Sequence, residues 1–194
     1  MPNLQTLSKY KYQIGIILLI LVLIPVYILS RNKITRFAKK FIGQEETTGN
    51  IDFKNESFKK LMIKAGWYPG AMWCSFFARM IWINKLTGKK KKIAEQLTHG
   101  ATQQTFVNFQ NDTSGLFEIA SIPKKGSIVI WQSIKTPQFG HAGIVTNVNS
   151  TGFETVEGNS NPNHHPGIVA IHKYSTFTST PNSDLKLRGF INIV

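Results

Sequence analysis

The sequence is poor in cysteine, since Cys74 is the only one among 194 residues. A lone cysteine excludes an internal disulfide and a zinc site built from cysteine thiolates. Acidic residues are also scarce, with 10 against 23 lysines and arginines, which gives a formal net charge of +13. Such a chain is attracted to polyanions such as nucleic acid, anionic lipid or an acidic cell wall. The charge alone does not choose among these partners.

The chain also lacks the composition of a disordered tail or of a multi-pass membrane protein. Hydrophobic residues make up 42% of it and charged residues 17%, which is typical of one compact domain with an appendage. No internal repeat is present, and no motif combines basic residues with stacking aromatics, so we expect no nucleic-acid partner. We expect a monomer that needs no cofactor and no metal ion.

One long apolar run lies near the N-terminus, from Ile14 to Leu29, and only Gly15, Pro25 and Tyr27 interrupt its aliphatic residues. Extended to 12–30, the run approaches the roughly 20 residues that span a bilayer. Lysines, arginines and tyrosines flank it, as at a membrane interface, and no small-residue cleavage signal follows it. We therefore predict an uncleaved transmembrane helix; a buried core helix is the alternative.

This anchor divides the chain into four parts. We expect a short basic tail at 1–11, the anchor at 12–30, a basic juxtamembrane segment and loop at 31–50, and a catalytic domain at 51–194. More basic residues follow the anchor than precede it, so the positive-inside rule would keep the domain in the cytoplasm. The chemistry of the candidate catalytic residues favours the opposite side. We therefore expect a single-pass protein of the bacterial cytoplasmic membrane with its catalytic domain on the outer, periplasmic or extracellular, face.

Helical patterns fill the first half of the domain and strand patterns the second half. The apolar spacing predicts helices at 34–42, 57–65, 74–85 and 101–110. The run Lys89 to Lys92 is interpreted as a solvated loop or helix end. After residue 126 the period changes to two, and the predicted strands lie at 127–131, 142–148, 153–157, 168–174 and 187–194. Helices followed by strands favour an α+β domain with N-terminal helices packed on a C-terminal antiparallel sheet.

Three short segments combine reactive side chains with suitable settings. Cys74 stands where the loop PGAMW enters a predicted helix, and the free N–H groups and macrodipole there favour a thiolate. His141 lies between a glycine and an apolar strand in FGHAGIV, where an imidazole can take the thiol proton. Glu157 and Asn159 lie two apart in TVEGNSNP and share one face of an extended chain. Either of them can orient the imidazole.

Each of these residues also has a structural interpretation. Cys74 alone would be a small buried hydrophobe, but its combination with a histidine and a carboxylate favours catalysis. Trp73 and Ser75 adjoin the nucleophile and are candidates for the substrate groove, although Trp73 is equally suited to packing. His164 and His165 are interpreted as a polar loop, because adjacent side chains of an extended chain point in opposite directions and no acid lies near.

These motifs resemble the CHAP family, whose name denotes cysteine, histidine-dependent amidohydrolases/peptidases with a papain-like fold. The resemblance rests on the W-C-x-x-F helix entry, the G-H-x-G-I-V strand and the E-G-N strand end, and it runs from about Phe37 to the end of the chain. It implies Cys74 as nucleophile and His141 as general base and acid. Glu157 would orient the histidine, with Asn159 assisting or sharing that role.

The resemblance also implies a substrate. Such enzymes cut amide bonds of peptidoglycan, so we expect an N-acetylmuramoyl-L-alanine amidase or a peptide endopeptidase that acts on peptidoglycan or another anionic wall polymer. Ser127 stands where relatives often have an aspartate, and no clustered aspartates of the calcium-binding kind are present. Two alternatives stay open. One is a cysteine amidase on a small soluble amide, and the other is a non-catalytic, membrane-tethered wall-binding module.

Overall fold

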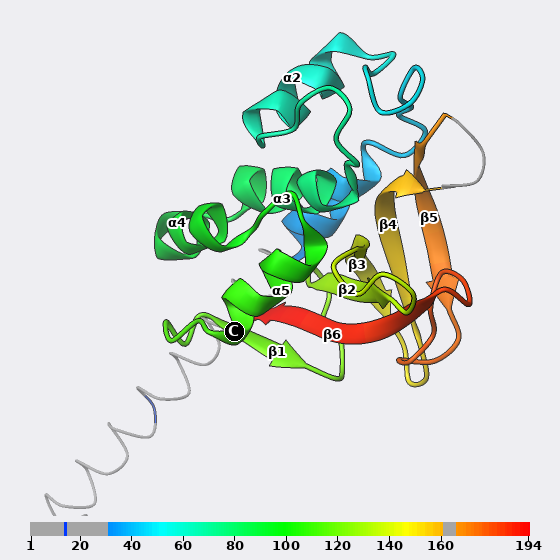
Figure 1. The fold of residues 1–194 in the computed structure, drawn as a ribbon. Helices are drawn as coiled ribbons and strands as arrows, with labels where there is room; N and C mark the ends of the chain where they lie inside the picture. Colours follow the sequence, from blue (N-terminus) through cyan, green and yellow to red (C-terminus); the bar gives the residue numbers. More distant parts are fainter. Residues whose placement is uncertain (1–13, 15–30, 161–165) are drawn as a thin grey trace, which may run out of the picture.

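The computed structural model describes residue 14, residues 31–160 and residues 166–194. The predicted tail and anchor therefore lie, apart from residue 14, outside the described residues. Among the residues that are described, none of the helices has the length and apolar character needed to cross a membrane. The described body is a layer of helices on a curved sheet (Figure 1).

The helices come first along the chain. Residues 31–39 are helical, and they are followed by α2 (Glu56–Lys64), α3 (Cys74–Lys85), α4 (Gly88–Leu97) and α5 (Thr102–Gln110). Asn55 caps α2, because its side chain accepts hydrogen bonds from the N–H groups of Ser57 and Phe58, two of the donors that a first turn leaves without a helical partner. The predicted bounds of α3 are confirmed, and α3 is buried on several faces.

The lysine run at 89–92 is helical, so the loop alternative of its interpretation is wrong, while the helix-end alternative agrees with its place at the start of a helix. It forms the first turns of α4, and lysine is itself a good helix former. The four consecutive charges hide the apolar stripe that should have predicted this helix. That stripe consists of Ala94, which is buried, and of Ile93 and Leu97, which pack against the same core.

The described strands form one six-stranded sheet in the order β1-β6-β2-β3-β4-β5, and every neighbouring pair is antiparallel. The strands are β1 (Phe117–Ala120), β2 (Ile128–Ser133), β3 (Gly140–Val148), β4 (Phe153–Ser160), β5 (Ile168–Tyr174) and β6 (Leu185–Ile193). The α+β class with an antiparallel sheet is thereby confirmed. The sequence pattern missed β1, which has only four residues and pairs with β6 at the edge of the sheet.

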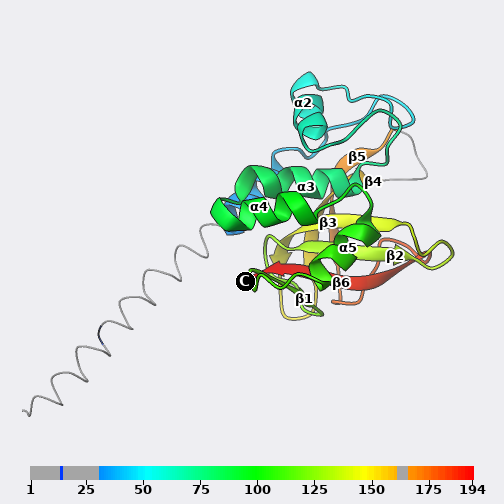
Figure 2. The same cartoon turned by 60° about the vertical axis from the view of Figure 1, so that its left-hand side comes forward.

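Both faces of the sheet are buried. The helices cover one face, where α3 lies against β3 and β4 and α5 against β1 and β2 (Figure 2). The opposite face carries a second, mostly aromatic core formed by Val129, Trp131, Val145, Phe153, Tyr174 and Phe190. Because side chains alternate along a strand, His141 of β3 lies on the same face as Val145, away from the helices. The nucleophile must therefore reach this histidine around the end of β3.

The segment 31–50 packs on this body. Ile34 and Ala38 are buried in the main core beneath the helices. The guanidinium of Arg31 donates hydrogen bonds to the backbone oxygens of Lys125 and Ile193. The boundary of the catalytic domain at residue 51 stays a prediction.

Candidate active site

Cys74 is the first residue of α3, and its side chain is buried, with the residue 5% exposed. The first hydrogen bond of this helix runs from the N–H of Phe77 to the oxygen of Trp73 at 2.9 Å. The N–H groups of Cys74 and Ser75 precede it and have no acceptor inside the helix. Their dipoles favour negative charge at this point, so the helix start is a suitable seat for a thiolate.

His141 meets both Cys74 and Glu157. Its Nε2 atom lies 2.9 Å from Oε2 of Glu157, and Cys74 lies near enough to the ring to raise the pKa of His141. Because Nε2 faces Glu157, Nδ1 is the nitrogen left to take the thiol proton. The structure thus brings together Cys74, His141 and Glu157 in the order that the sequence predicted.

The pKa values show how strongly these groups interact. Burial alone would lower the pKa of His141, but the hydrogen bonds and charges of Cys74 and Glu157 outweigh it and raise this pKa to about 10. Burial alone would raise the pKa of Glu157, yet the hydrogen bond and charge of His141, with smaller effects of His172 and Thr155, lower it. The arrangement therefore favours an imidazolium beside a carboxylate.

Glu157, rather than Asn159, is the group that faces the histidine. Asn159 has a positive φ of 54°, and the strand pairing is irregular between Glu157 and Ser160. The alternation of side chains therefore fails at this point, and the prediction that both residues share one face is wrong. The amide oxygen of Asn159 instead lies beside Gly167, where an added Cβ would come within 2.6 Å of it.

Two glycines allow the close contacts of this site. A Cβ at Gly143 would lie 2.6 Å from Cγ of Glu157, and a Cβ at Gly158 would lie 2.6 Å from Cβ of Phe77. Gly143 therefore gives Glu157 its place against β3, and Gly158 lets α3 approach β4. These contacts explain why the motifs around His141 and Glu157 have glycine at positions 143 and 158, where a side chain would not fit.

A family model described as the CHAP domain matches residues 65–159, which include Cys74, His141 and Glu157. The chain contains a CHAP domain. This family indicates a hydrolase of the amidase or peptidase kind that acts on peptidoglycan. No curated protein matches the chain.

Several residues around the carboxylate of the CHAP domain received no role from the sequence. Tyr174 donates a hydrogen bond to Oε1 of Glu157 at 2.8 Å, and the hydroxyl of Thr155 donates to the same atom. Nε2 of His172 lies 3.9 Å from Oε2. Tyr174 and His172 belong to β5, whose pairing with β4 no local pattern reveals, so these two contacts could not be predicted.

Trp73 and Ser75 are not lining residues of an open groove. Trp73 is fully buried, and its indole N–H donates to Oε2 of Glu46 at 2.7 Å. Ser75 is 3% exposed, and its hydroxyl donates to the backbone oxygen of His99 at 2.6 Å. The groove role predicted for both residues is therefore not supported, because both side chains turn into the interior and fix the start of α3.

Within residues 31–160 and 166–194, no three His, Cys, Asp or Glu side chains are grouped so that they could hold a metal ion. The pair His164 and His165, predicted to be part of a polar loop, lies outside the described residues.

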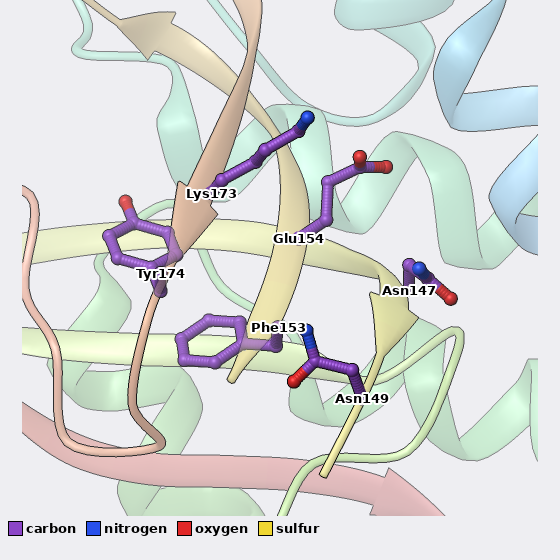
Figure 3. A pocket seen from close by; sticks show the side chains of 6 residues that line it. All are labelled: Asn147, Asn149, Phe153, Glu154, Lys173 and Tyr174. Carbon is purple, nitrogen blue, oxygen red and sulfur yellow. The ribbon is translucent and has the colours of Figure 1, made fainter. Parts of the chain in front are cut away.

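A cavity of about 250 Å³ opens where β3 ends and β4 begins, beside β5 (Figure 3). His141 lies at the opposite end of β3. The lining residues of the cavity are Asn147, Asn149, Phe153, Glu154, Lys173 and Tyr174. Tyr174 connects this cavity with the active site, since it lines the cavity and its hydroxyl donates a hydrogen bond to Glu157. The cavity thus lies behind the candidate catalytic residues and does not contain Cys74 or His141.

Proposed function

We propose that this protein is a cysteine hydrolase that cleaves amide bonds of peptidoglycan. Cys74 is the nucleophile, His141 the general base and acid, and Glu157 the group that orients the histidine. The observation that carries the proposal is the hydrogen bond between Glu157 and His141 within a CHAP domain, with Cys74 at the start of α3 near enough to raise the pKa of His141.

The geometry supports a two-step reaction. The sulfur of Cys74 attacks the carbonyl carbon of the amide and forms a thioester, while His141 gives a proton to the leaving nitrogen as the C–N bond breaks. Water, deprotonated by His141, then attacks the thioester and releases the acid and the free thiol. The N–H of Cys74 is suitably placed to stabilise the oxyanion of each tetrahedral intermediate, because it has no helical acceptor.

Zymography on purified cell walls tests this function with the full chain and its Cys74→Ala variant. We expect clearing by the wild type and none by Cys74→Ala, and equal clearing by both would refute the proposal. Glu157→Gln keeps the shape of the side chain but weakens the orientation of the imidazole, so it should reduce turnover by roughly 10²- to 10⁴-fold. Asn159→Ala, two residues further along the chain, should reduce turnover much less.

The bond that is cut is either the amide between N-acetylmuramic acid and L-alanine or a peptide bond of the stem or cross-bridge. Mass spectrometry of the released fragments distinguishes the two. A free lactyl carboxyl group on muramic acid together with a free L-alanine amino terminus identifies an amidase. A new amino terminus elsewhere in the peptide, with the muramoyl–L-alanine amide intact, identifies an endopeptidase.

We also propose that residues 12–30 anchor the protein in the bacterial membrane, with the CHAP domain on the outer face. The apolar run supports the anchor, and the exposed cations Lys33, Arg36 and Lys40 that follow it suit an anionic lipid surface. The outer face follows from the proposed peptidoglycan substrate and not from these cations. Anionic lipid attracts such cations by about 1 kcal/mol each near the surface. The lysines of α4 add positive charge at the same end of the body. Lys90 donates a hydrogen bond to the backbone oxygen of Val194, and Arg31 donates one to the backbone oxygen of the preceding residue, Ile193.

A topology reporter fused to the C-terminus tests the side of the membrane. A signal from outside the cytoplasm is expected. A cytoplasmic signal would instead agree with the excess of basic residues after the anchor and would favour a cysteine amidase that acts on a small soluble amide.

A further inference from the structure

The carboxylate of Glu157 is buried behind the proposed catalytic pair, with only 1% of the residue exposed. Its Oε2 atom lies 2.9 Å from Nε2 of His141 and 3.9 Å from Nε2 of His172. Its Oε1 atom accepts hydrogen bonds from the hydroxyls of Thr155 and Tyr174. The two oxygens therefore have different neighbours, with imidazoles on one and hydroxyls on the other.

Burial makes these neighbours necessary. A carboxylate that leaves water is strongly disfavoured unless donors replace its hydration, and an ionised carboxylate can only accept. Two hydroxyls on Oε1 also fix the rotation of the carboxylate plane, so that Oε2 faces His141. Groups that hold an orienting residue in this way determine where the oriented imidazole lies.

We propose that Tyr174 and Thr155 are positioning residues of the active site, whose hydroxyls hold Oε1 of Glu157 so that Oε2 stays ionised and aligned with His141. The inference rests on the proposed function, because it adds to the proposed triad the two residues that hydrogen-bond the carboxylate of Glu157. Neither residue touches a reacting atom. Both act through Glu157, and Tyr174 does so from β5, on the far side of β4 from His141.

The aromatic ring of Tyr174 has a second, purely structural role. It stacks on Phe153 with 4.8 Å between ring centroids and lies 5.3 Å from the ring of Trp131. Tyr174→Phe keeps this ring and removes only the hydroxyl, so the variant separates positioning from packing. At Thr155, valine removes the hydroxyl at nearly constant shape and serine retains it.

The test follows two pH profiles of the full chain: the rate at which iodoacetamide alkylates Cys74, and kcat and KM on purified peptidoglycan. Tyr174→Phe should move the acidic limb of both profiles to higher pH by about one unit, because Glu157 loses a donor to its charged form. It should lower kcat by about 10- to 100-fold and leave KM unchanged. Thr155→Val should act in the same direction.

Two control variants accompany these. Thr155→Ser keeps a hydroxyl and should retain the wild-type profiles. Tyr68→Phe removes the hydroxyl of a tyrosine that is 63% exposed and should leave both profiles unchanged. Unfolding curves of all variants show whether each one is folded over the pH range used.

The outcomes separate this inference from the proposed function. The alkylation profile needs no substrate, so shifted profiles without any clearing of peptidoglycan would reject the proposed substrate and keep the positioning role. An unchanged alkylation profile in folded Tyr174→Phe would overturn the inference, whatever the clearing. An equal shift in Thr155→Ser would also overturn it for Thr155, since volume and not the hydroxyl would then matter.

Discussion

At the start of β3, Gly143 leaves the space into which Glu157 fits. A Cβ at this position would come within 2.6 Å of Cγ of Glu157, and that carboxylate cannot easily move, because its oxygens are held by His141, Tyr174 and Thr155. Gly143→Ala should therefore displace the carboxylate from His141. We expect a loss of turnover of about 100-fold and a loss of unfolding free energy of about 1–3 kcal/mol.

Peptidoglycan clearing and urea unfolding measure the two effects of Gly143→Ala. Asn147→Ala is the matched control, because Asn147 lies on the same strand with an exposed side chain. Wild-type activity in Gly143→Ala would show that the carboxylate tolerates a shift, and would weaken its assignment to the triad.

At this scale, the sequence predicts the residues whose setting is local. Cys74 and His141 are marked by the helix entry and by the glycines beside them. Asn159 is misplaced because a positive φ ends the alternation on which its prediction depended. Tyr174 reaches Glu157 only through the pairing of β5 with β4, and that pairing is a long-range property which a residue pattern does not contain.

Among the elements, α3 is the one that joins the others to the sheet. Its Arg79 donates from Nε to the oxygen of Ala65 after α2 at 2.9 Å, and from Nη1 to the oxygens of Glu95 in α4 and of Thr98 after it, at 2.7 Å each. Arg79→Met keeps most of the aliphatic stem but leaves these carbonyls without their donor. We expect it to lower the unfolding free energy by about 1.5–3 kcal/mol.

Urea unfolding of Arg79→Met, compared with that of the control variant Lys91→Met, measures this loss of unfolding free energy. Lys91 is an exposed lysine of α4, so its replacement should change the unfolding free energy by less than about 0.5 kcal/mol. Equal losses in the two variants would mean that the carbonyls are satisfied by water and that Arg79 does not join the helices.

The elements also show where periodicity suffices. The bounds of α3 and β5 follow from apolar spacing and from flanking glycine or proline signals. In α4 the charged run conceals the apolar stripe, and in β1 four residues are too few for an alternation to be recognised. Both misses lie where the tertiary packing, rather than the local pattern, decides the structure.

For the molecule as a whole, the helix at 31–39 is part of the folded body. Ile34 and Ala38 are 1% and 0% exposed, and Lys85 at the end of α3 lies over the ring of Phe37 at 3.9 Å from its centroid. Both views show this helix, drawn in blue, against α3 (Figures 1 and 2). The sequence suggested a boundary at residue 51 because 31–50 is basic and rich in turn residues, like a linker.

Two fragments decide between these boundaries. Residues 31–194 should unfold cooperatively in urea. The fragment 51–194 lacks Ile34, whose burial alone contributes about 1.5–3 kcal/mol of the roughly 5–15 kcal/mol that stabilise a domain, so it should have a lower free energy of unfolding. In the longer fragment, Ile34→Ala should cost about 2–4 kcal/mol, and Lys33→Ala, at an exposed neighbour, less than about 0.5 kcal/mol. Equal unfolding free energies of the two fragments would place the boundary at residue 51. A difference carried by Ile34 would instead mean that the catalytic body begins no later than residue 34, four residues after the predicted anchor at 12–30, which leaves no room for a long flexible linker between the membrane and the active site.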